Sequence, residues 1–133
     1  MKSDRAEVAH LFRRAGFGAT AKELDVLTET MTYEDIVDQL INVDESPDID
    51  QAYIDRYYGG EGFQMYVATW IYRMLNSRRP LQEKMTLFLH HIFPVAWSKG
   101  QHAYTLFSEI DTFRKISMTD FRNILLELSL IHI

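Results

Sequence analysis

The sequence predicts an all-α protein, an irregular array of about six to seven helices that forms part of a larger helical domain. Apolar residues recur at helical spacing along most of the 133 residues. Residues that favour helix starts and helix ends separate these stretches. No stretch alternates apolar and polar residues with the period of two that a half-buried strand would show. These three observations favour helices throughout the chain.

Residues 1–42 are expected to form a group of N-terminal helices around the motif "HLFRRAGFG". The first helix should begin after Ser3 or Asp4, because both residue types cap helix N-termini well. It should stop at Gly16, which we expect in the left-handed conformation that often follows the last helical turn. The N-terminal group therefore begins with a short helix and a glycine turn.

Two capping signals predict the next two helices. Thr20 is followed three residues later by Glu23, which is the spacing of a capping box. Thr32 and Asp35 repeat that spacing with a shorter acidic side chain. Each threonine should therefore accept a hydrogen bond from a backbone N–H group in the first turn of the helix that it precedes.

Residues 43–62 are expected to form an acidic and glycine-containing linker. The stretch "NVDESPDID" is rich in acidic residues and contains Pro47, and "YYGGEG" follows it. Proline and paired glycines interrupt regular structure. The chain should therefore cross from the first helical group to the second through this segment.

Residues 63–127 are expected to form a second helical segment around the motif "RPLQEKM". A helix should run from about Phe63 to Asn76, and the next should begin with Pro80, which fits a first helical turn. Pro94 should end that helix, and two more helices should follow. The apolar faces are expected to contain Phe63, Val67, Trp70, Ile71 and Met74 in the first helix, and Leu81, Met85, Phe88, Leu89 and Ile92 in the second.

Composition limits the classes of function. The net charge of −5 argues against nucleic acid as a partner, because binding to it depends on neutralising phosphates. The chain has no cysteine, which excludes cysteine-ligated metals and thiol catalysis within it. We identify no cofactor and no membrane span, and the N-terminus has no apolar signal segment. The sequence as given predicts a cytoplasmic protein whose partner is another protein.

Three residues of the first motif could bind an anion. His10, Arg13 and Arg14 have i, i+3 and i+4 spacing, so one helical face can present all three. Two guanidinium groups on such a face could hold a phosphate or a carboxylate, with Arg14 as the clamp. The alternative is a solvated helix face that ends at a glycine turn.

Glu83 and His90 are the other candidates for catalysis. His90 and His91 are adjacent, so on a helix their side chains point about 100° apart and do not easily share one metal ion. Glu83 lies seven residues before His90, which is too far for direct contact. We therefore assign no metal site, with His90 as a weak candidate for a single ligand or for a general base. The alternative for His90 is a buried, hydrogen-bonded side chain.

Four specific segments cover nearly the whole chain. They are "AHLFRRAGFGATAKELD" (Ala9–Asp25), the stretch around "RPLQEKM" (Trp70–Phe88), "HHIF" to "WSK" (His90–Lys99) and "FRNILLEL" (Phe121–Leu128). Together, and in this order, they resemble the segments of DUF1800, a bacterial family of proteins of unknown function.

The resemblance implies a large bacterial protein that is rich in helix and, in many members, exported. It implies no particular reaction. By position, His10, Arg13 and Arg14 match the first family motif, and His90 matches the first histidine of a later H-x-H motif. Ile92 stands where the second histidine of that motif often is, which weakens a metal site built on a histidine pair.

Two functions of different class are consistent with this pattern. The first is a helical interaction or scaffold segment without a complete active site. The alternative is the N-terminal part of an enzyme, such as a hydrolase, whose site is completed by sequence downstream. If the enzyme hypothesis holds, His10, Glu83 and His90 should meet in one pocket.

The last six residues, "LSLIHI" (Leu128–Ile133), resemble a translated sequencing adapter. The codons CTG TCT CTT ATA CAC ATC encode them, and that string is similar to a transposase-end adapter. We therefore expect residues 128–133 to be an adapter-derived tail, and the C-terminal part of the same protein to be missing.

Overall fold

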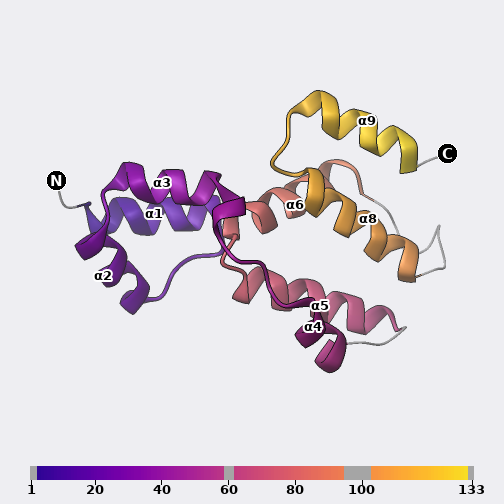
Figure 1. Cartoon of the computed structure of the whole chain (residues 1–133), viewed down its shortest axis with the longest axis horizontal. Coiled ribbons are helices and arrows are strands. Elements are labelled where there is room, and N and C mark those ends of the chain that lie inside the picture. The colour runs from indigo at the N-terminus through magenta and orange to yellow at the C-terminus, as the bar shows by residue number, and fades with distance from the viewer. Residues whose placement is uncertain (1–2, 59–61, 95–102, 132–133) are drawn as a thin grey trace.

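The computed structural model describes residues 3–58, 62–94 and 103–131 (Figure 1). These residues form α-helices and one short 3-10 helix but no strand, which confirms the all-α prediction. There are eight α-helices among them, one more than expected. The helices are α1 (Arg5–Ala15), α2 (Ala21–Thr30), α3 (Tyr33–Ile41), η1 (Val43–Glu45), α4 (Gln51–Tyr58), α5 (Phe63–Asn76), α6 (Pro80–Ile92), α8 (Ala103–Ile116) and α9 (Phe121–Ile131).

The expected capping residues begin the first three helices. The side chain of Asp4 accepts a hydrogen bond from the backbone N–H of Ala6 at the start of α1. Complete capping boxes begin α2 and α3, at Thr20 and Thr32. The sequence signals for these helix starts are therefore confirmed.

The turn after α1 differs from the prediction. Gly16 has a φ of −159°, an extended conformation, so the expected left-handed conformation at this residue is wrong. Gly18 is the residue with positive φ, at 100°. Its N–H donates a 3.1 Å hydrogen bond to the carbonyl of Phe12, which closes the turn two residues later than expected.

Helix α6 is the central element of the fold. It packs against α1, α3, α5 and α8, and Figure 1 shows it running from the N-terminal helices to the centre of the molecule. Leu81, in its first turn, packs on the N-terminal apolar cluster of Val8, Leu24, Ile36 and Leu40. Leu89, two turns later, belongs to a second cluster with Phe113, Ile116, Ile124 and Leu128. The helix ends at Ile92, two residues before Pro94, as expected.

The segment that we expected to be a linker, residues 43–62, is more structured than that. It contains the 3-10 helix η1 and the α-helix α4, which accounts for the additional helix. Val43, Ser46 and Ile54 are buried, and Tyr53 of α4 stacks on Tyr72 of α5 with ring centroids 5.6 Å apart. This segment packs on the fold instead of only connecting its two parts.

The last helix, α9, extends to Ile131 and so enters the expected tail. Leu128, the first tail residue, is buried in the second apolar cluster. Residues 132–133 and the "WSK" motif at 97–99 lie outside the described residues. The adapter origin of the tail stays a prediction.

In the described part of the chain, no helix is long and apolar enough to cross a membrane.

Candidate functional site

A buried polar layer lies between the two apolar clusters, where α5 and α6 meet α8. Helix α5 buries Thr69 and Arg73, and α6 buries Gln82, Glu83 and Thr86 along with Leu89. Several residues of the expected apolar faces are instead exposed, so those faces are wrong in part. The exposed ones are Phe63, Val67 and Ile71 of α5, and Phe88 and Ile92 of α6.

Arg114 of α8 is at the centre of this layer. Its Nε donates a 2.7 Å hydrogen bond to Oε1 of Glu83. Its two terminal nitrogens donate to the two oxygens of Asp48, with Nη1 2.9 Å from Oδ2. The planar guanidinium therefore holds two carboxylates at once, a geometry that lysine cannot reproduce.

Two more hydrogen bonds fix the backbone of Arg114. Nε2 of Gln82 donates to its carbonyl oxygen at 3.1 Å, and the Ser117 hydroxyl donates to the same oxygen at 3.0 Å. Helix α6 thus contacts Arg114 through both its side chain and its main chain. Buried polar groups have no water to bond to, so they must be paired within the protein. Each of these hydrogen bonds therefore restricts how α6 and α8 can pack.

The charges in this layer compensate one another. Burial by itself would raise the pKa of Asp48, but the hydrogen bonds and charge of Arg114 outweigh burial and hold that pKa below its usual value. Burial would likewise lower the pKa of Arg114, and its bonds to Asp48 and Glu83 raise it instead. Both groups of the Arg114–Asp48 pair therefore stay charged at neutral pH.

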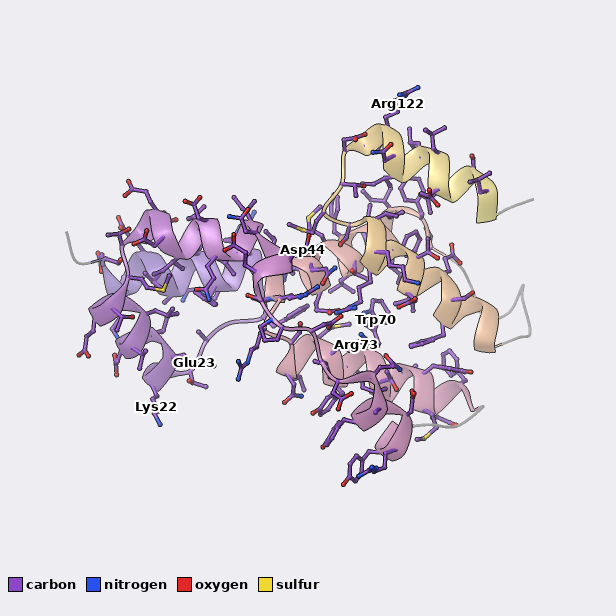
Figure 2. All side chains as sticks on the ribbon, viewed as in Figure 1. Lys22, Glu23, Asp44, Trp70, Arg73 and Arg122 are labelled. Carbon is purple, nitrogen blue, oxygen red and sulfur yellow. The ribbon has the colours of Figure 1, made fainter. Side chains whose placement is uncertain are left out.

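Arg73 of α5 is the second buried arginine. Its Nη2 donates a 2.7 Å hydrogen bond to Oε1 of Gln51 at the start of α4. Its Nε is buried without a hydrogen-bond partner among the described residues, as is Oε2 of Glu83. Burial and the charge of Arg114 lower the pKa of Arg73, partly offset by nearby carboxylates that include Glu83 and Asp48. Figure 2 shows Arg73 and Trp70 on the side of α5 that faces α8.

Three arginines together hold the acidic segment 43–51. Arg79, just before α6, donates from Nε to the carbonyl oxygen of Ser46 at 2.7 Å. Arg114 binds Asp48, and Arg73 binds Gln51. The segment is therefore fixed at successive points along its length, which explains why it is ordered despite its acidic composition.

His90 contributes an aromatic contact. Its ring lies edge-on to Trp70, with centroids 5.1 Å apart and planes at 87°, and it also approaches Phe113. Burial and then the charge of His91 lower the pKa of His90, so the neutral imidazole is favoured. His91 itself is exposed. The two adjacent histidines therefore face different surroundings, as their helical spacing requires.

The structure does not bring His10 together with Glu83 and His90. His10 is exposed on α1 and lines an open hollow with Ala6, Glu7 and Tyr33. Arg13 and Arg14 are exposed on the same helix. Neither arginine forms an ion pair or hydrogen bond within the described ranges. The first motif therefore presents its charged side chains to solvent, while Glu83 is buried between helices.

No metal site emerges from the side chains that the structure describes. Within those ranges, no three His, Asp or Glu side chains are grouped so that they could hold a metal ion. The weak candidate ligand His90 packs against Trp70 instead.

Comparison with known families identifies the family of this chain. The model of the family described as "Protein of unknown function (DUF1800)" matches residues 10–131. The chain belongs to the DUF1800 family. The DUF1800 match runs from the His10 motif through α9, so it includes all three arginines that hold the acidic segment. No curated protein and no solved structure matches the chain.

The residues that matter most in the buried layer were only partly predicted. Glu83 was a candidate, but Arg73, Arg114 and Asp48 were not. A weak signal existed for Arg73, because it lies between Tyr72 and Met74 in a largely apolar stretch, whereas Arg114 is followed directly by Lys115 and had no such signal. Asp48 had no such signal, because acidic residues surround it in the sequence.

Proposed function

We propose that this chain is a helical interaction module and that it binds an amphipathic helix of a partner protein along α5. The observation behind this proposal is the inverted polarity of α5, which exposes apolar residues and buries polar ones. Helices of water-soluble domains usually do the reverse. An apolar face in this position gains free energy when another surface covers it.

The exposed apolar residues of α5 form a ridge. Val67, Ile71 and Leu75 follow one another at four-residue spacing, with 37%, 48% and 73% of each residue exposed. Residues at i, i+4 and i+8 lie in one row along a helix, and such rows fit the grooves of a second helix. The ridge therefore has the shape that a partner helix needs.

The state of Glu83 supports this proposal over the alternative of a hydrolytic enzyme. Glu83 has no exposed surface, and Arg114 occupies one of its oxygens. A general acid or base must reach the atom with which it exchanges a proton. A carboxylate enclosed in this way serves the packing of α6 on α8.

The experiment uses photo-crosslinking in the native host of the gene. A photoreactive amino acid replaces Ile71, and Lys22 is replaced in a separate control, because its side chain points into solvent from α2 (Figure 2). We expect position 71 to crosslink to one partner protein, identified by mass spectrometry. The further change Leu75→Lys should remove that product while leaving the melting temperature in place, because Leu75 is exposed.

Two outcomes would count against the proposal. Equal crosslinking yields at positions 71 and 22 would mean that the ridge has no partner. A product that contains only a second copy of this chain would mean that the ridge serves self-association instead.

A further inference from the structure

The contact between Arg114 and Asp48 has the form of a bound ligand. The two terminal nitrogens of Arg114 grip both oxygens of Asp48, the two-point geometry by which arginine recognises a free carboxylate. Arg114 is buried, but 38% of the Asp48 side chain is exposed. The carboxylate therefore enters the site from the surface side of the fold.

The segment that supplies Asp48 is fixed on either side of that residue, by Arg79 at Ser46 and by Arg73 at Gln51. Ser46 and Ile54 are its buried neighbours along the chain, and residues 47, 48 and 50 are all exposed. The main tertiary contact of Asp48 is thus its pairing with Arg114. Because Asp48 belongs to neither apolar cluster and its side chain is partly exposed, that side chain can leave Arg114 while both clusters stay in place.

The buried layer requires an anion at this position. The carboxylates that act on Arg114 are Glu83 and Asp48, and Arg73 lies close enough to Arg114 for the two positive charges to repel. Without Asp48, Arg114 would keep Glu83 as its one ion-pair partner among the described residues. A single additional negative charge restores the balance, and an unpaired buried charge is costly.

A second observation also indicates a binding site. The Nε–H group of Arg73, a residue with 6% of its surface exposed, has no hydrogen-bond partner within the described residues. Buried polar groups are normally hydrogen-bonded. The layer therefore retains binding capacity that Asp48 does not use.

We propose that Arg114, with Arg73 beside it, forms a carboxylate-binding site in which Asp48 is an internal ligand that an external carboxylate can replace. The ligand class is a monoanionic carboxylate, such as the side chain of an acidic peptide segment or a small carboxylic acid. The planar two-oxygen geometry and the need for one negative charge both favour a carboxylate. This site does not depend on helix docking at α5, because it uses the buried side of that helix.

The test is chemical rescue of the full chain carrying Asp48→Ala. In sodium chloride at pH 7, its melting temperature should fall on the order of 10 °C below that of the unchanged protein. Sodium formate at the same ionic strength should recover at least half of that loss, and the recovery should grow with the logarithm of formate concentration. Acetate should act more weakly because its methyl group needs additional room.

Matched variants separate specific binding from general salt effects. Asp44→Ala is the control, because the Asp44 carboxylate is 99% exposed and lies 4.0 Å from Arg79. The melting temperature of this variant should be the same in formate and in chloride. The double change Asp48→Ala with Arg114→Gln should abolish the formate response, because it removes the nitrogens that would bind formate.

The result remains decisive if Asp48→Ala unfolds in chloride. Recovery of helical circular dichroism in formate then supports the site, and Asp48→Ser, which also removes the carboxyl group and leaves space for formate, repeats the measurement. If the melting temperature and helical content of the Asp48 variants were the same in formate, chloride and sulfate, the proposal would be overturned. A response to sulfate as large as that to formate would overturn the assignment to carboxylates.

Discussion

Gly16 lies against Pro80, so that a β-carbon added to Gly16 would lie only 2.9 Å from the β-carbon of Pro80. Gly16 belongs to the motif "HLFRRAGFG", which spans the end of α1 and the turn after it, and Pro80 begins α6. The two sequence motifs that identify the family are therefore in direct contact. Glycine at position 16 serves this close approach, since its own backbone is extended and needs no left-handed conformation.

We predict that Gly16→Ala destabilises the protein by about 1–3 kcal/mol, because the new methyl group must push the Pro80 ring or the helices apart. Urea denaturation followed by circular dichroism would measure the change. Gly62→Ser is the comparison, because a β-carbon at Gly62 meets no atom within 4 Å and serine can cap α5. Equal losses in the two variants would contradict the role of the Gly16–Pro80 contact.

The helix boundaries could be predicted from sequence because the residues that set them act locally. The Thr20 capping box depends on neighbours within one turn, and Pro94 affects only the helix that precedes it. Helix α4 escaped prediction because acidic residues and proline precede it. Its position depends on the distant Arg73, which binds Gln51 at its first residue.

Which side of each helix faces the core could not be predicted in the same way. Periodicity showed that α5 has an apolar side, and we assumed that this side faces the core. The structure instead covers the side with Thr69 and Arg73, because Glu83 and Gln51 supply polar partners there. Which side a helix buries depends on its neighbours in space, and one sequence does not identify those neighbours.

The buried arginine of α8 provides the second prediction. Arg114→Lys keeps the positive charge, but a single ammonium group cannot bind Asp48 at two points and also Glu83. We expect a loss of about 2–3 kcal/mol in the free energy of unfolding, because charged hydrogen bonds are broken while Glu83 stays buried. Denaturant unfolding at neutral pH would measure it.

Arg5→Lys is the control for that measurement. Arg5 pairs with Asp25 at 2.8 Å, but more than half of each side chain is exposed. Exposed ion pairs contribute only about 0–1 kcal/mol, so this change should have almost no effect. If Arg114→Lys cost no more than Arg5→Lys, the buried layer would not stabilise the packing of α6 on α8.

The third prediction concerns pH. The pKa of His90 is lowered in the folded protein from its ordinary value of 6.5 by burial and by His91. The unfolded chain therefore binds a proton at a higher pH than the folded chain does. Stability should fall as pH decreases from 7 toward 5, because protons then favour the unfolded state.

His90→Gln should reduce this slope, which denaturant unfolding at a series of pH values would measure. Asp48 adds a separate loss at lower pH, below its ordinary value of 3.8, because its pKa is also lowered in the folded protein. An unchanged slope between pH 5 and 7 in His90→Gln would assign the pH dependence to other groups.

The last prediction tests whether the end of α9 belongs to the fold. Leu128 has 6% of its surface exposed and packs in the cluster with Phe113 and Ile124, whereas Leu130 on the same helix is 64% exposed. Leu128→Ala should cost about 2–3 kcal/mol, since it removes buried methyl groups and leaves a cavity. Leu130→Ala should change the free energy of unfolding by less than about 0.5 kcal/mol, as exposed substitutions usually do. Similar small effects at both positions in denaturant unfolding would show that α9 contributes no packing at its C-terminal end, and Leu128 would then not belong to the folded core.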